Sequence, residues 1–154
     1  MAPFRKILVP VDFSPHSEEA TRVALQLARA FDAPVTLATV FQVPIYPLPE
    51  GAFIAFPNAY AEATVAAGKR LEEVAAAARA AGPTTIDIKV LEGVAFREIV
   101  AFAREGGFDL IVMGTHGRTG IKHALLGSVA EKVVRKAPCA VLTVRLTGHG
   151  FEHP

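Results

Sequence analysis

Glycines and a serine follow a short apolar segment in a spacing that suits the binding of an anion. The stretch begins at Gly114, continues with Gly117 and Gly120, and reaches Gly127 and Ser128. Such glycines allow positive φ angles and a close approach of the backbone to a ligand, and successive N–H groups of the loop can form an anion-binding hollow. Gly127 and Ser128 also open a predicted helix, whose free N–H groups favour phosphate. The spacing therefore predicts a phosphate-binding loop; the alternative is an ordinary glycine-rich turn followed by a serine cap.

Charged side chains in and near this stretch are further candidates. Arg118 and Lys122 add positive charge to it. His116 is interpreted either as a contact to phosphate or ribose, or as a polar side chain of the loop. Asp12, which follows an earlier apolar run, either belongs to the same site or pairs with the N–H group of Ser14 at a helix start. The P-loop pattern, G-x-G-x-x-G after the first strand, and the G-x-S-x-G nucleophile elbow are absent from the sequence.

The remaining residues that could bind metal or react give weaker signals. His149 and His153 have the i, i+4 spacing of a metal-binding pair, but the nearby Gly150 and Pro154 disfavour the helix that would hold them. Cys139 is the only cysteine, which excludes an intramolecular disulfide. We expect it to be a small core residue at the start of a strand. The sequence therefore predicts no protein-held metal site and no reactive thiol.

The elements that must position these residues alternate between two periodicities. Helices are predicted from the Ser14 cap to Asp32, over 59–81, around 96–103, and from 129 to Pro138. Four prolines between 42 and 58 predict a long loop there, which is typical of a lid or of disorder. Continuous or alternating apolar runs predict strands over 7–11, 35–41, 86–91, 110–113 and 140–144.

This alternation of strands and helices predicts a doubly wound α/β fold. Such an order favours a parallel sheet with right-handed crossovers and helices on both faces. We expect one domain over residues 1–146 and a flexible C-terminal tail over 147–154. Ligands of this fold class bind outside the carboxyl ends of the strands, at the switch in strand order. The turns after Val11, Val40 and Met113 are therefore the expected site.

Composition excludes several functional classes. The chain has 154 residues, a length that favours one domain, and its 16 Lys and Arg against 15 Asp and Glu give a net charge of +1. This balance argues against a dedicated nucleic-acid binder, which needs a basic excess. The sequence has no uncharged apolar run of about 18 residues that could span a membrane, and its start lacks the apolar core of a signal peptide. We expect a cytoplasmic protein.

The candidate loop and the first and last predicted strands resemble those of a known family. The pattern Gly114-x2-Gly117-x9-Gly127-Ser128 resembles the nucleotide-binding signature of the universal stress protein family. The segment from Lys6 to Asp12 is similar to that family's opening strand, and 137–144 is similar to its closing strand. The resemblance covers residues 4–146 and implies a five-stranded parallel sheet, the fold class that the periodicity predicts independently.

Carried over residue by residue, the resemblance implies a site for ATP. The adenine would lie against Asp12 and the backbone of Val40, with Pro10 and Val11 beside it. The ribose would meet Met113 and Gly114, with His116 near ribose or phosphate. A divalent Mg²⁺ or Mn²⁺ ion would lie between the phosphates. Ala130 stands where ATP-binding members often have Ser or Thr, which removes one possible phosphate donor. The phosphates themselves would be bound by Gly117, Arg118, Gly127, Ser128 and Val129.

Three functions follow from these observations. The first is a regulatory or stress-response protein that binds adenine nucleotide with slow or no hydrolysis, since the signature loop holds no Glu or Gln to position a water. The second is a slow ATPase or a phosphotransferase that uses His116 or Ser128 as phosphoacceptor. The third is a nucleotide-free interaction module. The resemblance implies a homodimer formed through the closing strand Ala140–Val144, and an exposed apolar edge favours such pairing.

Overall fold

The sheet at the centre of the molecule is five-stranded and parallel throughout. The computed structural model describes residues 3–42, 46–47, 53–54, 57–82, 84–117 and 126–146. The strand order is β5-β2-β1-β6-β7, and every neighbouring pair is parallel. The strands are β1 (Ile7–Pro10), β2 (Val35–Phe41), β5 (Ile86–Glu92), β6 (Leu110–Gly114) and β7 (Ala140–Val144).

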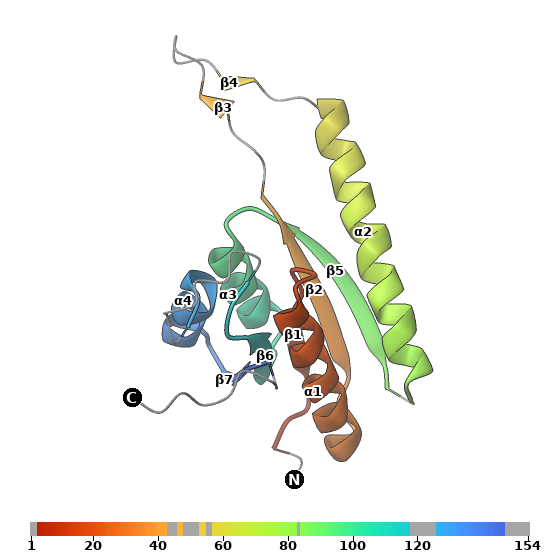
Figure 1. The fold of residues 1–154 in the computed structure, drawn as a ribbon. Coiled ribbons are helices and arrows are strands. Elements are labelled where there is room, and N and C mark those ends of the chain that lie inside the picture. Colours follow the sequence, from red (N-terminus) through yellow and green to blue (C-terminus); the bar gives the residue numbers. More distant parts are fainter. Residues whose placement is uncertain are drawn as a thin grey trace.

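Helices of the described residues cover the two faces of this sheet, two on each. The helices α1 (Pro15–Phe31) and α2 (Pro57–Ala80) lie on one face, and α3 (Ala95–Glu105) and α4 (Ser128–Lys136) lie on the other (Figure 1). The predicted doubly wound α/β fold is thus confirmed. Within the described residues, no helix has the length and apolar character needed to cross a membrane.

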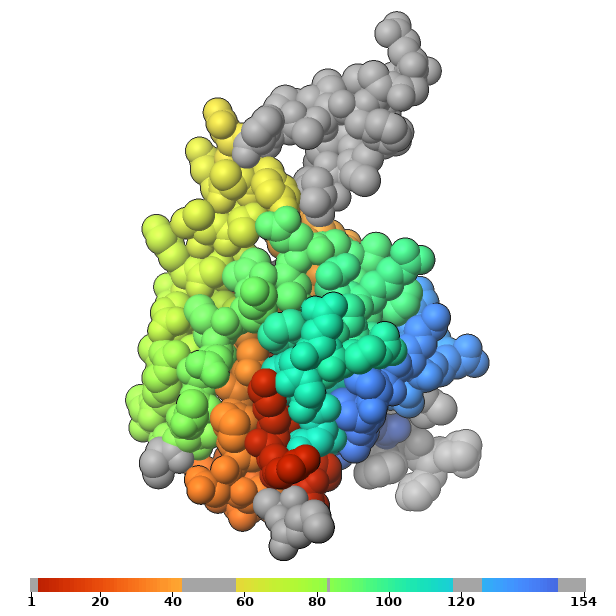
Figure 2. All heavy atoms as spheres, turned by 180° about the vertical axis from the view of Figure 1, so that it is seen from behind, coloured from red at the N-terminus to blue at the C-terminus, as the bar shows by residue number. Residues whose placement is uncertain are grey.

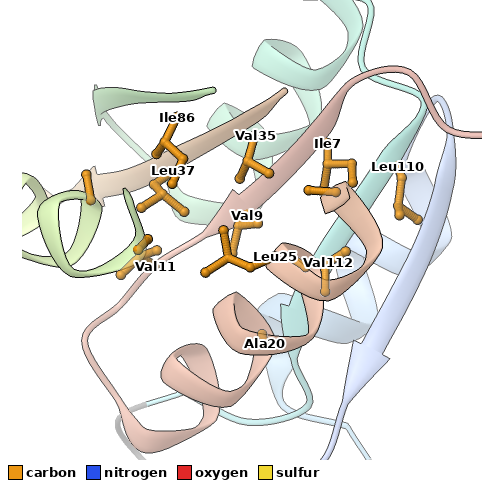
Figure 3. Close-up of a cluster of buried hydrophobic side chains, with 14 of the residues drawn as sticks. Ile7, Val9, Val11, Ala20, Leu25, Val35, Leu37, Ile86, Leu110 and Val112 are labelled. Atoms are coloured by element: carbon orange, nitrogen blue, oxygen red, sulfur yellow. The ribbon is translucent and has the colours of Figure 1, made fainter. Parts of the chain in front are cut away.

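A separate apolar core lies on each side of the sheet. On the α1 and α2 side, Ile7, Val35 and Leu37 of the strands belong to the same cluster as Ala20 of α1, and all four are fully buried (Figure 3). The opposite core joins strands β1, β6 and β2 to α3 and α4. The three central strands are buried on both faces. Their sequences are therefore continuous apolar runs and do not alternate between apolar and polar residues.

The first helix begins and ends where the sequence predicts. Ser17 donates its backbone N–H to Oγ of Ser14 at 3.2 Å, and Pro15 occupies the first helical turn. This is the N-cap arrangement, in which a side-chain oxygen satisfies an N–H group that has no partner in the helix. Asp32 ends the helix with a left-handed φ of 52°, a conformation that Asp tolerates better than most residues.

The segment 42–58 differs from the long irregular loop predicted for it. The two-residue strands β3 (Tyr46–Pro47) and β4 (Phe53–Ile54) pair with each other in antiparallel fashion, apart from the main sheet. Helix α2 begins at Pro57 rather than at residue 59. The prediction was wrong there because proline excludes the interior of a helix but suits its first position, where its missing N–H group costs nothing.

The two outer strands, β5 and β7, have one partly exposed face. Burial alternates along both, and Leu142 of β7 is 38% exposed. Cys139, just before β7, is only partly buried and packs against the core on the α3 and α4 side. Desolvation, followed by the nearby carboxylate of Asp109, raises the pKa of its thiol. The predicted tail 147–154 and its two histidines lie outside the described residues.

Candidate functional site

The order in which the strands are added to the sheet reverses between β1 and β6. It builds outward from β1 through β2 to β5, then crosses back to place β6 on the other side of β1. The chain runs from β1 into α1 on one face and from β6 into α4 on the other, which leaves a crevice at the carboxyl ends of these strands. Ligands of open α/β sheets bind in such a crevice.

A hollow occupies this position. Its volume is about 490 Å³, within the usual range of small-molecule sites. Its walls come from the ends of β1, β2 and β6, the loops after them, and the first turns of α3 and α4, with Ala67 contributed by α2. The described residues that line it are Pro10, Val11, Asp12, Phe13, Ser17, Ala38, Thr39, Val40, Phe41, Gln42, Ala67, Ala95, Ile99, Met113, Gly114, Thr115, His116, Gly117, Gly127, Ser128, Val129 and Ala130.

The glycines after β6 are required because two loops touch. A Cβ atom on Gly117 would lie 2.8 Å from Oδ2 of Asp12, and one on Gly114 would lie 2.8 Å from Cβ of His16. Neither glycine has a positive φ angle, and Gly127 has φ −69°. Gly114 and Gly117 therefore do not use the positive φ angles that glycine allows, and Gly120 lies outside the described residues. These two glycines allow the loops after β1 and β6 to pack closely.

Both arrangements that the sequence allows for the Asp12 side chain occur together. Its Oδ1 accepts hydrogen bonds from the backbone N–H of Ser14 at 3.0 Å and from the Ser14 hydroxyl at 2.5 Å. Its Oδ2 lies beside Gly117, and both residues line the hollow. The carboxylate is thus oriented by the start of α1 and also lines the candidate site.

Backbone hydrogen bonds fasten the β6 loop to the start of α4. Gly127 donates its N–H to the carbonyl of Thr115 at 2.6 Å, and Thr115 donates its own to Val144 of β7 at 3.0 Å. His116 follows directly, with its Nδ1 3.0 Å from Oγ1 of Thr115. The ring of His116 lies 5.4 Å, centroid to centroid, from that of His16. These contacts hold His116 and Gly117 at the same edge as the first turn of α4.

The start of α4 borders the hollow. Gly127 is its N-cap residue and makes no side-chain cap, while Ser128 is the first residue of the helix and is exposed. The alternative of an ordinary serine cap is therefore wrong. The first N–H groups of a helix lack intrahelical partners and, with the positive end of the helix dipole, favour an anion. Ser128, Val129 and Ala130 line the hollow at this end.

The opposite end of the hollow is formed by the ends of β1 and β2. Val11 donates its N–H to the carbonyl of Ala38 at 2.8 Å, so the backbone groups of Ala38 face β1. Residues two apart on a strand face the same way, and Val40 therefore directs its backbone groups to the same side, beyond the last residue of β1. They can supply one donor and one acceptor to a planar ligand.

Phe13 adds an aromatic wall beside these backbone groups. It has a left-handed φ of 63°, which is uncommon for a bulky residue and typical of functional sites. The Arg70 guanidinium lies over the Phe13 ring, 4.3 Å from its centroid. A side chain of helix α2 thus packs against the aromatic residue that forms one wall of the hollow.

The structure brings together all the predicted site residues that it describes. Pro10, Val11, Asp12, Val40, Met113, Gly114, His116, Gly117, Gly127, Ser128, Val129 and Ala130 line the hollow. Arg118, Lys122 and Gly120 lie outside the described residues. Phe13 and Thr115 were missed although they adjoin predicted residues in the sequence. Ala67, Ala95 and Ile99 were also missed, since small or apolar helical residues give no signal of a ligand.

The fold and hollow define a class of protein: a doubly wound α/β domain with a ligand-sized crevice at its switch point, bordered by a glycine loop and a helix N-terminus. The model of the universal stress protein family matches residues 3–145. A universal stress protein of Methanocaldococcus jannaschii is 40% identical over 144 residues, which cover 92% of this chain and 82% of that relative. This chain belongs to the universal stress protein family.

Solved structures agree with this assignment. A second universal stress protein of M. jannaschii superposes with a TM-score of 0.80 at 31% identity, covering 93% of this chain and 96% of the other. A universal stress protein solved in complex with cAMP has a TM-score of 0.69 at 30% identity, covering 92% of this chain and 97% of that one.

Proposed function

We propose that this protein binds an adenine nucleotide in the hollow and acts as a regulatory stress-response protein. The observation that carries the proposal is the contact between Gly117 and Asp12. It joins the loops after β1 and β6 around one hollow of ligand size. The related universal stress protein bound to cAMP supports an adenine nucleotide as the ligand class.

In this proposal the adenine lies at the β1 and β2 end of the hollow. The Val40 backbone would pair with the base edge, and Asp12 would accept a hydrogen bond from it, beside Pro10 and Val11. Met113 and Gly114 would meet the ribose in the middle. Strand ends suit this role because their backbone groups are held in place by the sheet and need no ordering when the ligand binds.

The phosphates then lie at the α4 end. Gly117, Gly127, Ser128 and Val129 would surround them, together with Arg118 and with His116 near ribose or phosphate. We propose ATP as the nucleotide, with Mg²⁺ or Mn²⁺ held by its phosphates. No group of three or more candidate metal ligands occurs within the described part of the chain. Ala130, which is 2% exposed, offers only its backbone.

Hydrolysis in this arrangement is slow or absent. A phosphoryl-transfer site needs a side chain that orients the attacking water. Gln42 lines the hollow, but it follows β2 at the proposed adenine end, away from α4. A purified protein that turned over ATP faster than about 1 per second, an ordinary enzymatic rate, would contradict the binding role.

The first experiment examines the protein as purified, without added nucleotide. The protein is denatured, the precipitate is removed, and the supernatant is separated by anion-exchange chromatography. We expect an adenine nucleotide near one equivalent per chain. The eluted species also distinguishes ATP from ADP, AMP and cAMP.

Calorimetric titration decides the outcome if the supernatant is empty. Mg-ATP, AMP and cAMP are titrated separately up to about 1 mM, and thermal unfolding is followed at the highest concentration. Binding to the folded state raises its stability, so heat release and a higher Tm support the proposal. A folded protein with neither response to any of the three nucleotides overturns it and favours a nucleotide-free interaction module.

We also propose that two copies of the chain form a homodimer through β7. The protein would act in the cytoplasm. The sheet ends at β7, and the side chain of Leu142 is partly exposed there. An unpaired edge strand is a ready template for a second chain. A single cysteine suits a reducing compartment.

A further inference from the structure

A second concave surface lies on the outside of α3 and α4. This groove has a volume of about 440 Å³. It lies on the face shown in Figure 2, where the green and teal atoms of α3 are beside the blue atoms of α4. Its described lining residues are Phe96, Arg97, Val100, Ala101, Arg104 and Lys136.

Cations converge on one aromatic ring in this groove. The Nζ atom of Lys132 lies 5.0 Å from the centroid of the Phe96 ring, and Lys136 Nζ and Arg97 Cζ each lie 5.8 Å from it. Arg104 stands two turns further along α3. All four cationic side chains are exposed, and none forms an ion pair with another described residue.

The groove combines this charge with an apolar strip. Phe96 and Val100 are four residues apart on α3, hence on one side of the helix, and Ala101 lies next to them. No acidic side chain is among the described residues that line the groove. The side chain of Glu98 is directed elsewhere, since a Cβ atom on Gly93 would lie 2.7 Å from its Oε1.

The arrangement places like charges close together. Arg104 and Lys136 lie in the last turns of α3 and α4, where the helix dipole favours cations, but no ion pair with a described residue offsets their mutual repulsion. Lys132 and Lys136 are four residues apart on α4, a spacing at which like charges destabilise a helix. The whole chain has a net charge of only +1. The positive charge is therefore concentrated locally in this cluster and does not reflect a basic protein as a whole. An anionic partner would relieve the repulsion.

We propose that this groove, which we call the α3–α4 groove, binds an acidic segment of a partner protein. Carboxylates of the segment would pair with Arg97, Arg104, Lys132 and Lys136. An apolar side chain beside them would cover the partly exposed Phe96 and Ala101, next to Val100, which is only 8% exposed. Charge complementarity selects the acidic partner, and the apolar strip selects a peptide that carries both kinds of side chain.

Nucleic acid fits this surface less well than an acidic peptide. The same two helices carry exposed carboxylates at Glu105 and Glu131, the latter paired with Arg135 at 3.2 Å. A phosphate backbone crossing the groove would approach these carboxylates, whereas a short peptide can end before them. Nucleic-acid binding also needs several phosphate contacts along a basic track.

The groove is separate from the nucleotide hollow. Ala95 and Ile99 of α3 line the hollow, while Phe96, Val100 and Arg104 line the groove. The two surfaces therefore use different sides of the same helix. The groove proposal does not rest on nucleotide binding, and each can fail without the other.

The test uses a fluorescein-labelled synthetic peptide of repeated Glu-Glu-Leu triplets and its analogue with Gln in place of Glu. Fluorescence anisotropy measures Kd for the full chain. We expect the Glu peptide to bind and the Gln peptide to bind at least tenfold more weakly. We expect the affinity for the Glu peptide to fall as salt is raised, because exposed charges are screened.

Paired variants locate the binding. The double variant Arg97→Gln, Lys136→Gln should raise the Kd of the Glu peptide about tenfold. The control Lys69→Gln, Lys89→Gln removes the same charge from exposed positions on α2 and β5 and should leave Kd within twofold. Circular dichroism checks that both variants are folded.

Three results overturn the proposal. The first is equal binding of the Glu and Gln peptides by the wild-type chain, a comparison that needs no variant. The second is an equal loss in the groove variant and the control, which would mean general attraction of charge. The third is tighter binding of a labelled single-stranded oligonucleotide than of the Glu peptide, lost in the groove variant, which would assign the surface to nucleic acid.

Discussion

At the scale of single residues, the signature glycines act through contacts within the protein. Gly114 and Gly117 have no positive φ, yet a Cβ atom at either position would lie 2.8 Å from an atom of the loop or helix that follows β1. Their role is to let two loops approach each other. A side chain there would therefore disturb the hollow before it touched a ligand.

Gly117→Val should abolish most nucleotide affinity while the fold remains. The new Cβ would displace the carboxylate of Asp12, and that carboxylate is proposed to hold the adenine. We expect the Kd for AMP or ATP to rise at least tenfold, about 1.4 kcal/mol or more, by calorimetry. Gly68→Ala is the control, since its Cβ would make an ordinary 3.8 Å contact. Unchanged affinity in a folded Gly117→Val protein would refute the site.

Cys139 should react slowly with alkylating reagents. Burial, followed by the charge of Asp109, raises the pKa of its thiol, so at a given pH less thiolate is present than in a free cysteine, and thiolate is the reactive form. We expect iodoacetamide at pH 8 to modify the folded chain more slowly than the same chain in urea. The difference should shrink as the pH is raised through the elevated pKa. Equal rates at pH 8 would contradict this reading.

At the scale of elements, α2 owes its position to a few apolar residues on an alanine-rich helix. Leu71, Ala75 and Ala78 are buried against the sheet, while Gly68 interrupts the helix interior. Glycine there carries an entropic cost that alanine does not. The helix is therefore less stable than its length permits.

Gly68→Ala should stabilise the protein by about 0.5–1 kcal/mol. The added Cβ has room, with Cγ2 of Val90 at 3.8 Å as its nearest neighbour. A Tm increase of roughly 1–4 °C in calorimetry is expected for a chain of this size. Gly82→Ala is the opposite case, because Gly82 has φ +150° and its Cβ would lie 2.9 Å from the Arg29 guanidinium. A rise in Tm for Gly82→Ala as large as that for Gly68→Ala would contradict the argument.

At the scale of the whole molecule, the sheet has two edges with different surroundings. Seven residues of β5 pair with β2, and α2 packs beside β5 (Figure 1). Among the described residues, no strand lies beside the outer edge of β7. A second copy of the chain paired there would cover Leu142 and extend the sheet.

Leu142→Arg should convert a homodimer into a monomer. A charged side chain at the centre of the proposed interface would be desolvated without a partner. Sedimentation at micromolar concentration measures the change. Val65→Arg on α2 places the same charge at a more exposed position, 57% against 38%, and should leave the dimer intact. A wild-type chain that sediments as a monomer would refute the β7 dimer.

Much of this arrangement could be predicted from the sequence, and the rest could not, for identifiable reasons. Strand and helix periodicity, the Ser14 cap and the glycine spacing are local patterns, so they predicted the elements and the strand-end residues of the hollow. Phe13 and Ala67 reach the hollow only through packing. The start of α2 at Pro57 was missed because proline has a different effect at the first helical position than inside a helix.

The α/β class, the positions of the strands and the loops that carry candidate ligand-binding residues follow from local patterns of residues, because each depends on residues near one another in the chain. Three contacts become visible in the folded molecule alone: Asp12 lies beside Gly117, the Arg70 guanidinium covers the Phe13 ring, and cations from α3 and α4 surround Phe96. These contacts join residues from different elements. They follow from the crossing of the chain over the sheet and the packing of helices on it, which no local pattern encodes.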